Sequence, residues 1–318
     1  MIPKFPLDRS ANFYIAGHRG MVGSAIWREA ERQGFTNLVG KTSEELDLTD
    51  RKAVFEFFAK EKPKHVVLAA AKVGGILAND TFPVDFLSEN LQIQVNVMDA
   101  ALEHGVERLL FMGSSCIYPK FAPQPISEDS LLTGHLETTN DAYAIAKIAG
   151  IKQVQSVRKQ HHKNWISVMP TNLYGPGDNY SEQGSHVLPA LIRRFETARL
   201  EGASKVTNWG TGSPMREFLY VDDLAEASLF LLENYDGDQQ VNVGVGDDLT
   251  IKDLAHLVAK AVGYLGEIKW DTSKPDGTPR KLLDVSTLNN MGWRAKTGLE
   301  DGIRMAVQDY RARFGDNS

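Results

Sequence analysis

Residues 12–23 read NFYIAGHRGMVG, a short apolar run followed by three glycines spaced three residues apart. The run is typical of a buried strand, and the residues after it have the spacing of an amphipathic helix. A strand that turns through such glycines into a helix suits a dinucleotide pyrophosphate, because the backbone can approach closely and the first N–H groups of the helix face the charge. The stretch predicts a Rossmann-type fold, with a ligand-free glycine turn as the alternative. The glycines are Gly17, Gly20 and Gly23.

The first half of the chain continues this alternation of strand and helix patterns. Strand patterns lie at 12–17, 37–41, 65–71, 108–114 and 165–171, and amphipathic helical patterns lie near 22–33, 50–60, 89–104 and 142–160. Such alternation predicts βαβ units and a parallel sheet. We therefore expect an α/β fold, a doubly wound parallel sheet of Rossmann type, with a dinucleotide-binding domain over residues 1–172.

The texture of the sequence changes in the second half, where loops rich in Gly, Pro and Asn separate shorter helical patterns. Long ordered loops on a scaffold usually bind something, so residues 173–318 are expected to form a smaller C-terminal α/β domain that holds the substrate. The segment 221–242 is expected to pack back on the first domain. It contains VDDLAEASLFLLE (221–233), an apolar helical face after a helix cap predicted at Asp222 or Asp223.

Composition and charge exclude several classes of partner. The chain has 318 residues and a formal net charge of −6, so neither nucleic acid nor an anionic membrane is an expected partner. No window approaches the about 20 apolar residues of a membrane span, and the start MIPKFPLDRS lacks the apolar core of a signal peptide. With one cysteine and no export signal, a cytoplasmic protein is expected. His161 and His162 are adjacent rather than one helical turn apart, so no metal site is expected.

Two cations bear on which dinucleotide would bind. The second predicted strand ends in Gly40-Lys41-Thr42, where an NAD-preferring fold normally places an acid for the ribose 2′-hydroxyl. Lys41 suits a 2′-phosphate instead, and Arg19, inside the glycine turn, could clamp the same group. Either alone would pass for a solvated surface charge, but their joint placement favours NADP over NAD.

A serine, a tyrosine and a lysine follow in an order that suits carbonyl chemistry. Tyr143 and Lys147 are four residues apart in DAYAIAKIAG, so they share one face of a helix. An ammonium beside a phenol lowers the pKa of the phenol, which would fit the tyrosine for proton transfer at a carbonyl oxygen. Ser114 ends a predicted strand, at the edge where open parallel sheets bind ligands. The pair alone is a common chance match, and its order after the glycine turn is what favours an oxidoreductase.

Together these landmarks resemble the extended short-chain dehydrogenase/reductase superfamily, in which GHRGMVG, the strand-end Ser114, YAIAK and PTNLYGPGDN occur in this order. More narrowly, GHRGMVGSAIW, AAAKVGGI, GSSCIYPK, YAIAKIAGIK, MPTNLYGP, SHVLPALIRRF, SPMREF and KPDGTPRKLLD are similar to the branch that acts on GDP-4-keto-6-deoxy-D-mannose. The resemblance covers nearly the whole chain. It implies a homodimer that inverts C3 and C5 and then reduces the C4 ketone with NADPH to give GDP-L-fucose. The first domain would bind NADP, and the C-terminal domain would bind the GDP-sugar.

The resemblance also implies roles for individual residues. Tyr143 would give a proton to the C4 oxygen, supported by Ser114 and Lys147. Cys116 and His186 would be the base and the acid of the inversions. The cofactor would be bound by Gly17, His18, Arg19, Gly20, Met21, Val22, Gly23, Lys41, Met112, Gly113, Ser114, Ser115, Lys147, Pro170, Thr171, Asn172, Leu173 and His186. The GDP-sugar would be bound by Arg194, Trp209, Arg216, Asp276 and Lys281.

Inversion beside a ketone would give the single cysteine a role. The C4 ketone acidifies the hydrogens on C3 and C5, and inversion needs a base on one face of the ring and a proton donor on the other. A thiol whose pKa is lowered by positive neighbours could be the base, and a histidine the acid. If the backbone of GSSCIYPK (113–120) stays extended, Ser114 and Cys116 point to one side. By default, a lone cysteine is a small buried hydrophobe, and a histidine in a polar loop such as His186 is a cap or a surface residue.

Other functions stay open at this point. Another nucleotide-sugar reductase, a 4-epimerase or a 4,6-dehydratase of the same superfamily would share the fold. A dehydratase needs an acidic pair after the strand-end hydroxyl, where this chain has Ser115-Cys116. A plain reductase would not need Cys116 and His186. A non-catalytic dinucleotide sensor would share the fold, but it would have no reason to keep the serine, the tyrosine and the lysine together.

Overall fold

A six-stranded parallel sheet forms the centre of the computed structural model of the chain, which describes residues 4–182, 184–274 and 276–315. Its strands are β1 (Phe13–Ala16), β2 (Leu38–Val39), β3 (His65–Leu68), β4 (Arg108–Met112), β5 (Ile166–Pro170) and β10 (Val241–Val243). They lie in the order β10-β5-β4-β3-β1-β2, and each neighbouring pair is parallel. The predicted α/β fold with a Rossmann-type sheet is confirmed.

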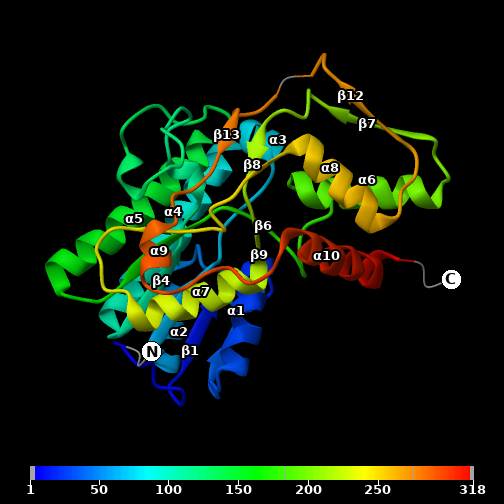
Figure 1. Cartoon of the computed structure of the whole chain (residues 1–318). Coiled ribbons are helices and arrows are strands. Elements are labelled where there is room, and N and C mark those ends of the chain that lie inside the picture. Colours follow the sequence, from blue (N-terminus) through cyan, green and yellow to red (C-terminus); the bar gives the residue numbers. More distant parts are fainter. Residues whose placement is uncertain (1–3, 183, 275, 316–318) are drawn as a thin grey trace.

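Helices cover both faces of this sheet (Figure 1). They are α1 (Met21–Arg32) and α7 (Val221–Asn234) on one face, and α2 (Arg51–Glu61), α4 (Pro83–Glu103) and α5 (Asp141–His161) on the other. Successive residues of a strand point to opposite faces. In β1, Phe13 and Ile15 therefore pack in the core with α1 and α7, whereas Tyr14 and Ala16 pack in the core with α2, α4 and α5. Because both faces are covered, the strands are apolar at nearly every position.

The path of the chain creates a crevice at the carboxyl edge of the sheet. From β1 the chain goes to β2 on one side and then crosses to β3 on the other, and open α/β sheets bind ligands where the strand order changes in this way. Gly17 follows β1 with a φ of +84°, and a Cβ on it would lie 2.8 Å from the backbone nitrogen of Ala70 after β3. A Cβ on Gly23 would lie 2.1 Å from the carbonyl oxygen of Gly17. Glycine alone allows these backbones to approach so closely.

The chain returns to the sheet late, through α7 and β10. Helix α7 packs against α1, and β10 extends the sheet by pairing with β5. The helix cap predicted at Asp222 or Asp223 is wrong, because the N-cap residue of α7 is Tyr220 and both aspartates lie in the first turn. The carboxylate of Asp223 instead accepts hydrogen bonds of 3.3 and 2.9 Å from the backbone N–H groups at 296–297. It ties a distant loop to this helix.

The remaining elements form a smaller α/β region beside the sheet (Figure 1). Its helices α6 (Val187–Leu200), α8 (Ile251–Val262) and α10 (Leu299–Phe314) share one apolar core. Within it, the buried carboxylate of Glu196 forms an ion pair of 2.7 Å with Arg311. Short strands pair as β6 (Asn172–Tyr174) with β9 (Phe218–Tyr220), β7 (Lys205–Trp209) with β12 (Glu267–Asp271), and β8 (Met215–Arg216) with β11 (Leu249–Thr250) and β13 (Arg280–Lys281).

Some predicted strands run past the ends of the observed ones. Residues 69–71, which the pattern assigned to a strand, have left the sheet after β3. They are followed by α3 (Ile76–Thr81), a helix that the sequence patterns did not predict. Another short helix, α9 (Ser286–Asn290), follows β13 in the chain. Within the described ranges, no helix is both long enough and apolar enough to cross a membrane.

Candidate active site

A cavity of about 790 Å³ occupies the crevice at the carboxyl ends of the strands. Every residue that the sequence suggested for catalysis or for the cofactor lines this cavity, from the glycine turn after β1 to His186 before α6. The loops after β2 and β3 complete its wall. Of the residues suggested for the GDP-sugar, Lys281 also lines it. The fold thus brings side chains from both halves of the chain into one cavity.

The glycine turn and two nearby cations fit a dinucleotide that carries an extra phosphate. The N-cap residue of α1 is Gly20, and no described side chain caps the helix, so its first N–H groups are available to an anion. Arg19 and Lys41 both line the cavity. The Nζ of Lys41 lies 3.7 Å from the Oε1 of Glu45, and this half-exposed pair is weak enough for a phosphate to displace. The residues present therefore fit NADP.

The backbone after β4 turns sharply instead of staying extended. Residues Ser115–Ile117 form one turn of 3-10 helix, and Ser114 is its N-cap residue. The Oγ of Ser114 accepts a hydrogen bond of 3.3 Å from the backbone N–H of Cys116. The expectation that an extended backbone points these two side chains to one side is therefore wrong. Both still line the cavity, because the turn folds Cys116 back toward Ser114.

Helix α5 places Tyr143 and Lys147 in the cavity one turn apart. The ammonium of Lys147 donates a hydrogen bond of 2.8 Å to the carbonyl oxygen of Met112, and burial lowers the pKa of this lysine to about 7. Burial and the negative charge of a Cys116 thiolate raise the pKa of Tyr143, against a smaller lowering by a hydrogen bond with Ser114. The predicted lowering of the Tyr143 pKa by Lys147 is wrong, because loss of solvent dominates and the ammonium points to the backbone.

Donors from two distant segments meet at the sulfur of Cys116. The Nζ of Lys281 lies 3.6 Å from Sγ, and the Nδ2 of Asn140 lies 3.5 Å from it. Burial raises the pKa of Cys116, but the charge of Lys281 and the hydrogen bonds to the sulfur outweigh this effect and lower the pKa below its ordinary value. A lowered pKa favours the thiolate, which is the form that can act as a base.

His186 is the N-cap residue of α6, the place where a histidine in a polar loop would by default cap the helix. Its side chain makes no capping hydrogen bond to any described residue and lines the cavity instead. The residue keeps part of its surface exposed, although protein atoms crowd around its ring. Burial of the ring therefore lowers the pKa of His186, and the positive charge of Lys281 lowers it further.

Three of the residues suggested for the GDP-sugar lie beyond the cavity, around the end of β7. The Nη1 of Arg194 donates a hydrogen bond of 2.5 Å to the Oδ1 of Asn208. The next residue, Trp209, is 71% exposed, so its ring is free to stack. Asp276 accepts hydrogen bonds of 2.9 and 2.7 Å from the backbone N–H and the hydroxyl of Thr211. Trp209 and Asp276 are exposed and Arg194 is half-buried, and none of the three lines the cavity that the cofactor residues line.

Arg216 and Lys281 are register partners on the neighbouring strands β8 and β13. The residue after Arg216, Glu217, is fully buried. Its carboxylate accepts hydrogen bonds of 2.6, 2.7 and 3.1 Å from the N–H groups at 245–246 and of Leu283. These bonds fix both strands, and with them the two cations, to the loop that follows β10.

The sequence motifs do not point to Asn140 or Glu217. An asparagine directly before a helix is normally a cap, so nothing in the sequence pointed from Asn140 to a sulfur 24 residues earlier. Glu217 lies inside the motif SPMREF, but a glutamate between two short strands carries no sign of its backbone partners. In both cases the partners come from segments that only the folded chain brings together.

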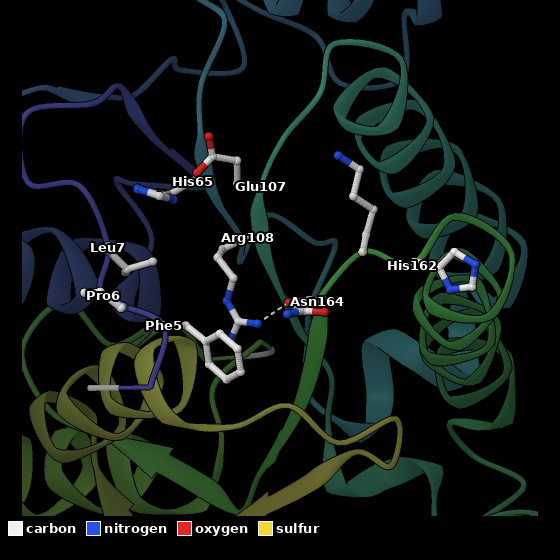
Figure 2. Close-up of a pocket in the computed structure, with 9 residues that line it drawn as sticks. Phe5, Pro6, Leu7, His65, Glu107, Arg108, His162 and Asn164 are labelled. Carbon is white, nitrogen blue, oxygen red and sulfur yellow. Dashed lines mark hydrogen bonds between the residues drawn. The ribbon is translucent and has the colours of Figure 1, made fainter. Parts of the chain in front are cut away.

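A smaller cavity of about 350 Å³ lies at the opposite, amino-terminal edge of the sheet (Figure 2). The guanidinium of Arg108 at its floor donates hydrogen bonds to the carbonyl oxygens of Leu232, Tyr235 and Asn164. It also lies 4.8 Å from the centre of the Phe5 ring. Because these backbone carbonyls use its donors, Arg108 has a structural role in joining the start of β4 to the end of α7 and to the residues before β5.

Comparison with known protein families assigns the chain to one of them. A model of the NAD dependent epimerase/dehydratase family matches residues 13–244, a span that holds the glycine turn, the strand-end serine and the tyrosine and lysine pair. The chain is therefore a member of the NAD dependent epimerase/dehydratase family, in agreement with the resemblance that the motifs carry.

Relatives within that family narrow the class to the GDP-L-fucose synthases. GDP-L-fucose synthase 1 of Arabidopsis thaliana is 60% identical over 95% of this chain and 94% of the relative. A solved structure of a GDP-L-fucose synthetase from Naegleria fowleri bound to NADP has a TM-score of 0.91 and 28% identity, covering 98% of this chain and 96% of that one. A structure of a GDP-mannoheptose C4 reductase from Campylobacter jejuni with NADP bound has a TM-score of 0.89 and 37% identity, covering 96% and 100%.

Proposed function

We propose that the chain converts GDP-4-keto-6-deoxy-D-mannose to GDP-L-fucose, with NADPH as the hydride donor. The near full-length identity to a GDP-L-fucose synthase supports the substrate, and NADP in two related structures supports the cofactor. The observation that carries the proposal is one cavity lined by Ser114, Cys116, Tyr143 and His186 together with the residues that fit NADP. This set of groups can both invert a carbon beside a ketone and reduce the ketone.

The inversions need a base, an acid and a place for negative charge. The thiolate of Cys116 takes a proton from the carbon next to the ketone, and the electron pair of that C–H bond moves into the ring to leave an enolate at the C4 oxygen. Ser114 and Tyr143 donate hydrogen bonds to this oxygen and stabilise the charge. His186 gives a proton to the opposite face of the carbon, which inverts it. C3 and C5 both flank C4, so one set of groups serves both carbons.

The reduction uses the same donors on the C4 oxygen. When bound, NADPH supplies the hydride to C4. Tyr143 gives its phenolic proton to the oxygen as the carbonyl becomes an alcohol, and the raised pKa of Tyr143 keeps the phenol protonated for this step. Lys147 is anchored on the carbonyl oxygen of Met112 and is assigned to the nicotinamide ribose.

The GDP part of the substrate is assigned to the smaller region of the fold. The cations of Arg194 and Arg216 suit the diphosphate, and the exposed ring of Trp209 suits stacking on guanine. Lys281, which lines the cavity beside Cys116, is assigned to the sugar end of the substrate. Asp276 is assigned to the same end of the substrate. In this proposal the cofactor half spans residues 1–172 with 221–242 packed on it, and the GDP-sugar half spans residues 173–318.

We also propose that the chain works as a cytoplasmic homodimer. Helices α4 and α5 pack against each other and present apolar side chains on their outer surface, where Val95 is 38% and Ile145 is 46% exposed. A second copy packed on these helices would bury that surface. Sedimentation of the purified chain tests the dimer, and a monomer at micromolar concentration would refute it.

Deuterium exchange tests the proposed function against its rivals. The chain is incubated with GDP-4-keto-6-deoxy-D-mannose in D2O, first without and then with NADPH. We expect deuterium at C3 and C5 before NADPH is added, and GDP-L-fucose with loss of NADPH absorbance afterwards. Reduction without prior exchange would identify a plain C4 reductase, and NADPH binding without turnover would identify a sensor. Cys116→Ala should lose exchange but keep NADPH binding, and normal exchange in that variant would refute the role of the thiol as base.

A further inference from the structure

Asn140 occupies the N-cap position of α5, but its side chain does not cap the helix. Asparagine is among the best N-cap residues, because its side-chain oxygen accepts hydrogen bonds from the first free N–H groups. Here the Nδ2 lies 3.5 Å from the Sγ of Cys116. The Oδ1 is buried and has no hydrogen-bond partner among the described residues. The side chain is thus directed to the thiol and away from the helix that it begins.

Lys281 approaches the same sulfur from β13, with its Nζ 3.6 Å away. The N–H groups of the next two residues donate hydrogen bonds of 2.9 and 3.1 Å to the side chains of Gln124 and Glu217, which holds this strand in place. The preceding residue, Arg280, points elsewhere and forms an ion pair of 2.7 Å with Asp248. The backbone therefore directs one cation to the sulfur and its neighbour away from it.

We propose that Asn140 and Lys281 are positioning residues that hold Cys116 as a thiolate and set its strength as a base. This inference rests on the function proposed above. A sulfur that accepts two hydrogen bonds, one of them from a cation, is better stabilised as an anion than as a neutral thiol. Because Asn140 begins the helix that carries Tyr143, the base and the proton donor of the C4 oxygen are held in one geometry.

The charged groups around Cys116 favour the thiolate on balance. Burial opposes ionisation of the thiol. The positive charge of Lys281 has the largest effect in the other direction and favours the thiolate. The guanidinium of Arg216 also interacts favourably with a thiolate. An ionised Tyr143 would repel it, but the raised pKa of that phenol keeps it neutral. Burial lowers the pKa of His186 and the charge of the same lysine lowers it further, so Lys281 acts on both members of the proposed pair.

The single cysteine makes the proposal directly measurable. Cys116 is the only cysteine of the sequence, so the rate of alkylation by iodoacetamide against pH reports one thiol, with neither substrate nor cofactor present. The parent should show a midpoint below about 8.5, the usual pKa of a free thiol. Lys281→Met and Asn140→Ser should each raise the midpoint by about one pH unit or more. Alkylation at neutral pH should then slow by about three- to tenfold, since a more basic thiolate is also a better nucleophile.

Matched variants separate this role from a structural one. Lys281→Arg keeps the charge and should restore a midpoint near that of the parent. Arg280→Met removes the neighbouring charge that points away and should leave the midpoint unchanged. Asn140→Ser keeps a residue that can cap α5, so its resistance to urea should match or exceed that of the parent while its midpoint rises. Unchanged midpoints in both Asn140→Ser and Lys281→Met would overturn the proposal.

Two further readouts keep the result decisive. If a variant fails to bind NADPH and has therefore not folded, Asn140→Asp provides the second measurement, because a carboxylate of the same shape beside the sulfur should raise the midpoint. An unchanged midpoint in that variant would also overturn the proposal. Shifted midpoints with no deuterium exchange by the parent would refute the epimerase while the support of the thiolate stands. Full exchange by the parent with unshifted midpoints would support the epimerase and refute the proposed roles of Asn140 and Lys281.

Discussion

The ammonium of Lys147 donates a hydrogen bond of 2.8 Å to the carbonyl oxygen of Met112, the last residue of β4. The bond joins helix α5 to the strand end that is followed by Ser114. Among the described residues, Lys147 has no carboxylate partner, and burial lowers its pKa to about 7. A buried cation without a counter-charge destabilises a fold. A role in the active site therefore explains the buried ammonium of Lys147, because it does not stabilise the fold.

Lys147→Met should abolish reduction and change how stability depends on pH. In the parent, the folded-state pKa of about 7 lies below the unfolded value of 10.5. Between these pH values the unfolded chain binds more protons, so the stability of the parent rises with pH. The variant lacks this titration, so its stability relative to the parent should be greatest at neutral pH and should decline toward pH 10.5. Urea unfolding at several pH values measures this, and a constant difference would contradict it.

Tyr143→Phe should separate reduction from epimerisation. Loss of a general acid typically slows a reaction by about 10²- to 10⁴-fold, and we expect this for NADPH oxidation. Exchange at C3 and C5 should fall less, because Ser114 still donates to the enolate oxygen. Tyr118→Phe is the control, since this buried phenol bonds to Asn242 at 2.6 Å and does not line the cavity. Equal losses of both activities in Tyr143→Phe would argue against separate roles.

Lys281→Met should move the pH profile of deuterium exchange to higher pH. Removing the cation raises the pKa of Cys116, because the thiolate loses a stabilising charge, and raises the pKa of His186, because the imidazolium loses a repelling one. Exchange requires thiolate and imidazolium together, so its rate against pH is bell-shaped. Both limbs should therefore move in the alkaline direction. Movement of a single limb would show that Lys281 acts on only one of the two groups.

Lys41→Asp should weaken the use of NADPH far more than the use of NADH. An aspartate at this position would repel the 2′-phosphate of NADPH, whereas it could accept a hydrogen bond from the 2′-hydroxyl of NADH. We expect the KM for NADPH to rise at least about tenfold, which corresponds to about 1.4 kcal/mol. The control is Lys52→Asp, at an exposed lysine that pairs with Glu56 at 3.7 Å outside the cavity. Equal changes for both cofactors would remove Lys41 from the 2′-phosphate site.

Gly150→Ala should destabilise the chain although alanine is the better helix former. The exchange normally gains about 1 kcal/mol inside a helix, but a Cβ at this position would lie 2.3 Å from the Cζ of Phe111. Phe111 is buried in the core beneath α5, where overpacking costs about 1–3 kcal/mol and outweighs the gain. In a Phe111→Leu background the same substitution should be neutral or stabilising. Thermal unfolding measures both, and a more stable single variant would show that the ring can move aside.

Much of the cofactor half could be predicted because its signals are local. The three glycines after β1 and the apolar periodicity of α1 lie within about twenty residues, and the sheet followed from repeated strand and helix patterns. Tyr143 and Lys147 could be placed together because a helix fixes residues four apart on one face. In each case a few neighbouring residues decide the backbone, and the backbone decides the relationship.

The predictions that proved wrong concern what the surroundings do to a residue. Asp222 and Asp223 have cap chemistry, but α7 begins at Val221 and its N-cap residue is Tyr220. The backbone past Ser114 was expected to stay extended, yet residues Ser115–Ile117 form a 3-10 turn. The pKa of Tyr143 was expected to fall beside an ammonium, and burial raises it. Each of these outcomes depends on residues outside the local sequence.

The sequence by itself determined the strand, glycine turn and helix of residues 12–23, the parallel α/β fold and the one-turn spacing of the tyrosine and the lysine. These features depend on backbone conformation and on the periodicity of short segments. Only the tertiary structure decided that Asn140 and Lys281 meet the sulfur of Cys116, although Lys281 is 165 positions away. It alone also shifted the pKa values of Cys116, Tyr143 and Lys147. The reason is that distances between remote side chains, and the exclusion of water around them, arise from the packing of the whole chain.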